Sequence, residues 1–152
     1  MTSNGRIISL DKPLVMGIIN VTDDSFYNGS RYKLGFRIAA RAEQIIREGG
    51  SIIDVGACST RPGAKPVSEQ QELKRLAKAL HAIRKKYPEA IISVDTYRSR
   101  VARMAVGDYR ANIINDISAG ELDPEMFSTI AELKIPYVLM HMRGTPETMQ
   151  QN

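Results

Sequence analysis

The sequence predicts an α/β protein built on a parallel sheet. Five short apolar runs, typical of buried strands, alternate with segments whose apolar residues recur at helical spacing. Strands joined through helices are parallel and connected by right-handed crossovers, because tight hairpins join only antiparallel neighbours. The chain has 152 residues, of which 43% are hydrophobic and 25% charged. This composition is that of an ordinary globular domain and argues against disorder and low complexity.

The first half of the chain is expected to contain two strands and two helices. Residues 14–20 form the first strand, and Gly49-Gly50 end the helix that follows it. Residues 52–57 form the second strand. The second helix has the best-marked start, because Ser68 and Gln71 have the spacing of a capping box. The apolar faces of the two helices carry Ile38, Ala42, Ile45 and Ile46, and then Leu73, Leu76, Ala77, Leu80 and Ile83.

The second half is expected to add three strands and two helices. Residues 91–95, 112–116 and 136–140 form the strands. The last helix begins at Asp123-Pro124, because aspartate caps helix N-termini and proline is tolerated in a first turn. The inward-facing residues of the two helices are Val101, Met104 and Ala105, and then Met126, Phe127 and Ile130. Before the first strand, residues 6–10 are expected to form a short hairpin arm.

Charge and cysteine content exclude several classes of protein. The 21 Lys+Arg and 17 Asp+Glu give a net charge of +4, which is too small to indicate nucleic-acid binding without a basic stripe. The basic cluster Arg84–Lys86 ends a helical pattern, so we interpret it as helix capping rather than as a binding patch. The single cysteine, Cys58, cannot form an internal disulfide. With no apolar run of about 18 residues and no signal-peptide core, we expect a cytoplasmic protein that does not bind membranes.

Polar residues lie at the carboxyl ends of all five predicted strands. In parallel α/β folds these ends form the ligand site, because the loops there can vary without disturbing the sheet. The alternative for each residue is that it caps the following loop or helix. These residues are Asn20, Asp54, Asp95, Asn115-Asp116 and His141.

Two loops after the strands also have the composition of a binding site. Residues 20–30 are too polar for a core and too aromatic for a plain linker, and we interpret them as an active-site flap. In residues 59–63, Arg61 offers a planar fork to an anion beside the turn at Pro62-Gly63. Neither a P-loop nor a Rossmann glycine fingerprint occurs, so the sequence gives no support for ordinary nucleotide binding.

Several motifs follow one another from about residue 14 to about 149: Met16–Thr22 with Asp24–Phe26, Ile53–Gly56, Ser59–Ala64, Val94–Thr96, Ile114–Asp116 and Met140–Pro146. Together, and in this order, they resemble the dihydropteroate synthase family. The resemblance implies a (β/α)8 TIM barrel. It also implies a transferase and sulfonamide target that joins dihydropterin pyrophosphate to p-aminobenzoate in folate synthesis.

The resemblance implies that residues 1–152 form the amino-terminal part of one barrel domain. Barrels of this type need about 250 residues. Strands six to eight would be absent, and with them a strand aspartate, a lysine-bearing motif and an Arg-x-His. We therefore expect the isolated chain to be inactive. We also expect it to associate as a homo-oligomer such as a dimer, because its first and last strands would expose apolar edges.

The resemblance also implies a role for each matching residue around the pterin. Asp95 and Asn115 would bind the hydrogen-bonding edge of the pterin, which suits a carboxylate that accepts and a carboxamide that both donates and accepts. Asn20 would help to hold Mg²⁺ and the pyrophosphate. Met140 would pack on the pterin face, with core filling as the alternative.

The second substrate is assigned to the two loops. Phe26 in the first loop, and Thr60 and Arg61 in the second, would close over p-aminobenzoate. The implied mechanism is dissociative: pyrophosphate leaves, and the aromatic amine attacks a pterin-stabilised cation in a closed site.

The first loop departs from the family pattern. Asp23 replaces the usual proline, and Asn28 stands where many members carry an aspartate that stabilises the cation. Asp23 or Asp24 is the candidate substitute. Ala57-Cys58 also replaces the usual Gly-Glu, which predicts different packing at the base of the second loop.

Other readings stay open. A pterin-binding methyltransferase domain shares the barrel and the Asp/Asn pair, but the two substrate loops favour the synthase. A fragment that only binds a pterin or associates with itself is the alternative from another class. Cys58 with His141 could be a nucleophile and base, but no third group orients them. His81 is expected on the surface of its helix.

Overall fold

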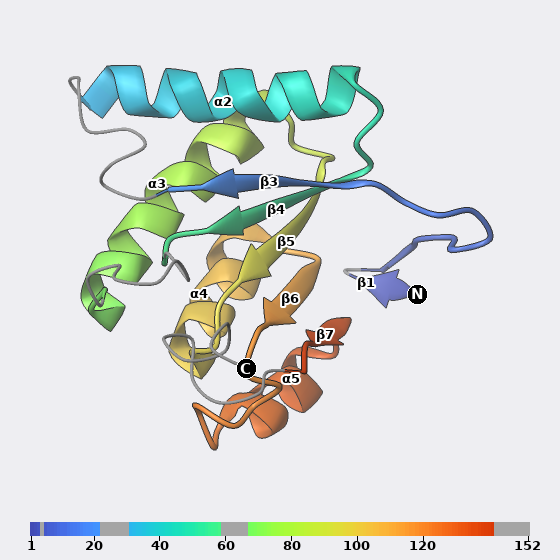
Figure 1. Ribbon diagram of the computed structural model, residues 1–152, viewed down its shortest axis with the longest axis vertical. Helices are drawn as coiled ribbons and strands as arrows, with labels where there is room; N and C mark the ends of the chain where they lie inside the picture. The colour runs from blue at the N-terminus through green and yellow to red at the C-terminus, as the bar shows by residue number, and fades with distance from the viewer. Residues whose placement is uncertain (4, 22–30, 59–66, 142–152) are drawn as a thin grey trace, which may run out of the picture.

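The computed structural model describes residues 1–3, 5–21, 31–58 and 67–141. The described elements alternate between strand and helix along most of this length (Figure 1). The strands are β1 Thr2–Ser3, β2 Arg6–Ile7, β3 Met16–Asn20, β4 Ile52–Gly56, β5 Ile91–Asp95, β6 Ile113–Asp116 and β7 Tyr137–Leu139. The helices are α2 Arg31–Arg47, α3 Glu69–Lys86, α4 Ser99–Tyr109 and α5 Met126–Leu133.

The main sheet is parallel, and its strand order follows the chain: β3-β4-β5-β6-β7. The helices follow the same order beside the strands, as Figure 1 shows by the progression of colour from blue to red. β1 and β2 form a separate antiparallel pair. This arrangement confirms the predicted class, and the hairpin lies slightly earlier in the chain than predicted.

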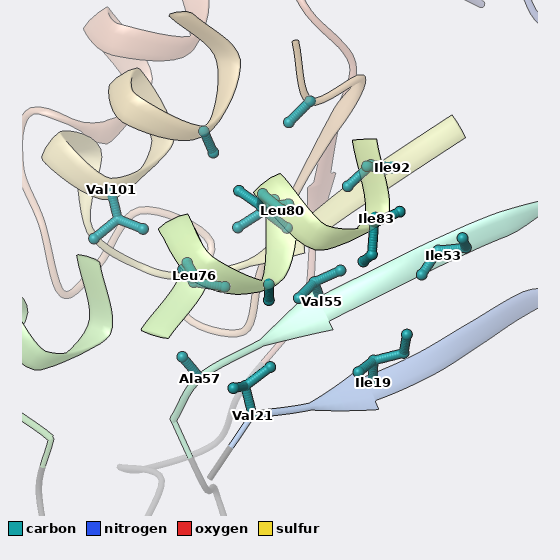
Figure 2. Packing of buried hydrophobic residues seen from close by; sticks show 14 of the residues in the cluster. Ile19, Val21, Ile53, Val55, Ala57, Leu76, Leu80, Ile83, Ile92 and Val101 are labelled. Atoms are coloured by element: carbon teal, nitrogen blue, oxygen red, sulfur yellow. The ribbon is translucent and has the colours of Figure 1, made fainter. Parts of the chain in front are cut away.

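One face of the sheet packs against the helices and forms the core (Figure 2). Ile53 and Val55 of β4 lie on this face and are almost completely buried, as are Leu76 and Leu80 of α3. Close approach at this face requires glycine at position 17, because a Cβ there would lie 2.4 Å from the Ile45 Cγ2 atom.

The other face carries the polar residues, because neighbouring residues of a strand point to opposite sides of the sheet. Ile53 and Val55 face the helices, so Asp54 and Gly56 face away from them. The register places Asp54 beside Ser93, and Gly56 beside Asp95. The residues predicted at the strand ends are therefore positioned by the alternation of each strand.

The predicted helix signals are largely confirmed. Ser68 caps α3, and both hydrogen bonds of the capping box with Gln71 are present. Gly49 adopts a φ of +94° after α2. Two details were wrong. Phe127 is 54% exposed because its ring packs edge-on against Tyr137 instead of entering the core, and Ile46 is 40% exposed because it lies beside the buried face of α2.

The last helix begins later than predicted. Asp123 does not cap α5, which has Glu125 at its N-cap position. Instead, the Asp123 carboxylate accepts a hydrogen bond of 2.7 Å from the backbone N–H of Ser99. The aspartate therefore satisfies a donor in the first turn of α4, the neighbouring helix, while its second oxygen accepts from the Glu125 N–H.

The basic cluster at the end of α3 has a structural role, but Arg84 binds neighbouring turns instead of capping its own helix as predicted. Arg84 satisfies acceptors contributed by the turns at the amino-terminal ends of β5 and β6. Its guanidinium donates to the carbonyl oxygens of Tyr109, Pro88, Ala90 and Arg110 and to Asn112 Oδ1. His81 is exposed on α3, as predicted. None of the helices in the described ranges is sufficiently long and apolar to cross a membrane.

Candidate binding site at the carboxyl ends of the strands

Four neighbouring strands end in one row of residues on the face that points away from the helices. The register aligns Asn20 with Gly56, Gly56 with Asp95, and Asp95 with Asn115. Gly56 leaves the space between its neighbours open. A Cβ at this position would lie 3.0 Å from Asp95 Oδ2 and 3.2 Å from Asn20 Oδ1. The structure therefore brings together Asn20, Asp95 and Asn115, three residues that the sequence analysis predicted to lie in the site.

A second layer lies one step below this row. Asp54 and Ser93 are register partners in this layer, and both are buried, with Asp54 only 4% exposed. The side-chain amide of Asn115 connects the layers, because its Nδ2 donates a 3.3 Å hydrogen bond to Asp54 Oδ2. Asp54 is thus part of the site through its contact with Asn115.

Hydrogen bonding in these layers is incomplete. Asp54 Oδ1, Ser93 Oγ and Asn115 Oδ1 are buried and have no hydrogen-bond partner among the described residues. Buried polar groups in folded proteins are almost always paired, and each exception needs an explanation. Three such atoms in two adjacent layers are the pattern expected of a site that binds a polar ligand.

The carboxylates of the site are less acidic than usual. Burial, followed by the charges of Asp54, Glu72 and Asp116, raises the pKa of Asp95 to about 7. Burial also raises the pKa of Asp54. A ligand that brings N–H donors or positive charge would stabilise the ionised carboxylates, which water does only weakly here.

Two of the strand-end residues have other roles or positions. Asp116 faces the helix side, where its carboxylate accepts hydrogen bonds from Ser118, Gly120 and Tyr137. It therefore caps the loop after β6, as the alternative reading proposed. His141 is exposed.

A buried ion pair near the site was missed by the sequence analysis. Glu72 in the first turn of α3 is 1% exposed. Its carboxylate pairs with the Arg98 guanidinium and accepts a 2.6 Å hydrogen bond from Thr96 Oγ1. The available signal was weak: an acidic residue in the buried face of a helix, with its partner 26 positions away.

The same cluster decides the role of Cys58. Burial and the nearby charge of Glu72 raise the pKa of this thiol to about 12. A thiol with such a pKa stays protonated at neutral pH and is a poor nucleophile. The nucleophile hypothesis for Cys58 has no support in this geometry.

The remaining predicted site residues are distributed as follows. Met140 directly follows β7 and is 41% exposed, so its role stays a prediction. Asp24, Phe26, Thr60 and Arg61 lie outside the described residues. Among the residues the structure describes, there is no cluster of three or more His, Cys, Asp or Glu side chains suited to a metal ion.

The parallel sheet, with helices on one face and polar strand ends on the other, has the arrangement of consecutive βα units of an α/β barrel. Comparison with known proteins gives the family. A family model described as "Pterin binding enzyme" matches residues 16–152. The chain belongs to this family of pterin-binding enzymes.

Individual relatives agree with this assignment. The chain is 48% identical to the mitochondrial folate synthesis bifunctional protein of Pisum sativum, over 99% of this chain and 29% of that protein. It is 42% identical to the dihydropteroate synthase of Synechocystis, over 90% of this chain and 46% of that protein.

Solved structures give the same result. The Yersinia pestis dihydropteroate synthase, in complex with a sulfonamide drug, matches all of this chain with a TM-score of 0.83 and 35% identity, over 54% of that structure. The Xanthomonas albilineans enzyme with 4-aminobenzoic acid matches 93% of this chain with a TM-score of 0.83 and 38% identity, over 52% of that structure. The chain therefore has the fold of part of a TIM barrel and spans about half the length of these solved relatives.

Proposed function

We propose that this chain supplies the pterin-binding part of a dihydropteroate synthase, which joins dihydropterin pyrophosphate to p-aminobenzoate. The proposal rests on the buried oxygen atoms without hydrogen-bond partners, on Asp54, Ser93 and Asn115, near Asp95 at the carboxyl ends of the strands. The names of the relatives favour the synthase over a methyltransferase domain.

The chemistry of a pterin fits these acceptors. The edge of a pterin carries an amino group and a ring N–H, which are donors that a carboxylate such as Asp95 accepts in pairs. Asn115 offers its Oδ1 as a further acceptor. A substrate bound here would pair atoms that are otherwise buried without partners, so its binding would recover the free energy of those missing hydrogen bonds.

The proposed reaction exchanges one bond for another. The bond between the pterin methylene carbon and the pyrophosphate oxygen breaks, and its electron pair leaves with pyrophosphate. The amine nitrogen of p-aminobenzoate then forms a bond to the same carbon and loses a proton. No protein nucleophile is needed. The ionised carboxylate of Asp95 would stabilise the cationic pterin through its negative charge.

A Mg²⁺ ion is compatible with the residues present. Asn20 is exposed at the rim, and its Oδ1 borders the space that Gly56 leaves open. A single amide oxygen suits Mg²⁺, which keeps several waters and takes its other ligands from phosphate groups. Asn20 would hold the ion beside the pyrophosphate, and the bound ion would neutralise charge on the leaving group.

The p-aminobenzoate side rests on residues outside the described ranges. We propose that Phe26, Thr60 and Arg61 contact this substrate and that Asp24 supplies the loop carboxylate. Met140, partly exposed after β7, would cover the pterin face. Because the solved relatives are about twice as long as this chain, we propose that activity needs the complete barrel.

The test is titration of a complete barrel that contains this chain with dihydropterin pyrophosphate, with and without Mg²⁺. Asp95→Asn should weaken binding by about 2–4 kcal/mol, because substrate N–H groups lose a charged acceptor. Arg103→Gln is the matched control, since Arg103 forms an exposed ion pair with Glu132 on the outer helices. Equal affinity in the two variants would show that the site is assigned wrongly.

A further inference from the structure

Asp54 is a buried carboxyl group in the described part of the chain whose presence the packing does not explain. It is 4% exposed, and no ion pair in the described part of the chain neutralises it. Its Oδ1 has no hydrogen-bond partner there. A buried carboxyl without compensation destabilises a fold, and apolar side chains occupy equivalent positions in the same sheet layer, at Ile18 and Ile113. Stability therefore does not account for an aspartate at this position.

Asp54 accepts a hydrogen bond from the side chain of Asn115. Asn115 Nδ2 lies 3.3 Å from Asp54 Oδ2. A carboxamide has two ends of similar shape, one that donates and one that accepts, and its neighbours decide which way it points. A carboxylate oxygen only accepts, so it holds the donating end of Asn115 toward the interior.

This contact leaves the accepting end of Asn115 available. Asn115 Oδ1 is buried and has no partner among the described residues. Asp54 would hold Asn115 in this orientation whether or not its own carboxyl carries a proton, because Oδ1 of Asp54 is available for the proton and Oδ2 still accepts. The site then presents a fixed acceptor, rather than a group that could offer either a donor or an acceptor.

We propose that Asp54 is a positioning residue that fixes the amide of Asn115, so that the site accepts ligands with an N–H donor at this point and rejects ligands with an acceptor there. The inference rests on the proposed function, in which Asn115 binds the pterin edge. Asp54 acts on the substrate through Asn115 and is the specificity-determining residue for the polarity of this contact.

A double-mutant cycle in the complete barrel tests the proposal. Binding of dihydropterin pyrophosphate is measured by titration calorimetry for Asp54→Asn, Asn115→Ala and the double variant. We expect Asp54→Asn to weaken binding by roughly tenfold, the size of one charged hydrogen bond, because asparagine permits either orientation of Asn115. The double variant should bind no more weakly than Asn115→Ala alone, because both changes act through one side chain. If the affinity losses of the two single variants multiply in the double variant, the proposal is overturned.

Steady-state kinetics separates positioning from general damage. Asp54→Asn should raise KM for the pterin substrate and leave KM for p-aminobenzoate within about twofold, since only the pterin contact changes. Thr129→Val is the matched control, because Thr129 Oγ1 on α5 is also buried without a partner but lies on a helix outside the site. An equal rise of both KM values in Asp54→Asn would indicate a structural role and contradict the proposal.

A measurement on the wild-type protein removes any dependence on the folding of a variant. The Nδ2 protons of Asn115 should exchange slowly with solvent in the ligand-free complete barrel, because one of them is bonded to Asp54. Exchange at the rate of a free carboxamide would overturn the proposal. If Asn115→Ala leaves pterin binding unchanged, the proposed function itself fails. If Asn115→Ala weakens pterin binding but Asp54→Asn leaves it unchanged, only the positioning role of Asp54 fails.

Discussion

Two buried acidic residues lie on opposite sides of the same sheet: Glu72 on helix α3 and Asp54 on strand β4. They differ in how their carboxylate oxygens are paired. Both oxygens of Glu72 have partners: Thr96 donates to one, and Arg98 pairs with the other. Asp54 has one 3.3 Å hydrogen bond and one oxygen without a partner in the described ranges. The difference separates a carboxylate that holds elements together from one that is available to a ligand site.

The partners of Glu72 show what its cluster holds. Arg98 also donates a 2.9 Å hydrogen bond to the carbonyl of Val67, the residue before the capping serine of α3. Its backbone N–H donates to Thr96 Oγ1, directly after β5. The cluster therefore joins the starts of α3 and α4 to the end of β5, next to Asp95.

We expect the largest effect from removal of the paired carboxylate, Glu72. Glu72→Ala should lower the free energy of unfolding of the complete barrel by about 3–5 kcal/mol, because Arg98 then stays partly buried without its partner. Urea unfolding measures the loss. Glu69→Ala is the control, since its pair with Arg100 is exposed and worth about 0–1 kcal/mol. Similar losses in both variants would contradict a structural role for the cluster.

The pH dependence of stability should reveal the raised pKa of Asp95 on the other face of the sheet. The pKa of Asp95 is raised from 3.8 to about 7, so the ligand-free native state keeps a proton that the unfolded chain releases. The stability contributed by this group is complete below pH 3.8 and is lost as the pH rises through about 7. Within that window the loss is about 1.4 kcal/mol per pH unit.

Asp95→Asn removes this contribution. Unfolding of the ligand-free complete barrel, followed across the same pH window, should depend less steeply on pH in the variant than in the wild type. Parallel curves for the two proteins would show that Asp95 is ionised in the native state throughout. Binding of a ligand with N–H donors should release the proton, which calorimetry in buffers of different ionisation enthalpy detects.

The smallest effects come from two glycines in contrasting surroundings. Gly56→Ala would introduce a Cβ 3.0 Å from Asp95 Oδ2, and we expect a loss of about 1–3 kcal/mol in pterin binding. Gly107→Ala adds a Cβ to open space on α4 and should stabilise the fold by about 0.5–1 kcal/mol. Titration and thermal unfolding measure the two effects. Unchanged pterin affinity in Gly56→Ala would mean that the space above Gly56 is not used.

The sequence predicted the elements and the first layer of the site, because both depend on short-range patterns. β5 has the predicted bounds, and the capping box of Ser68 is present. Asp95 and Asn115 come together because parallel strands in register align their ends. Patterns within one strand or one helix start are sufficient for each of these predictions.

Features that depend on packing between distant segments could not be predicted in the same way. The Glu72–Arg98 pair joins two helices, and neither sequence position indicates its partner. Phe127 has helical spacing with buried neighbours, yet it is 54% exposed, with its ring edge-on to Tyr137. The contact between Asp54 and Asn115 joins non-neighbouring strands across β5, so it requires the register of three strands.

The strand order of the sheet has a consequence for how the protein is made. Each strand from β4 to β7 pairs with the strand immediately before it in the chain, so none of the pairings between these described strands waits for a distant segment. Loop closure is therefore limited to one strand–helix unit at each step. As the chain leaves the ribosome, the sheet can grow by one unit at a time, and β3 and β4, which carry Asn20 and Asp54, can pair before Asp95 and Asn115 are synthesised.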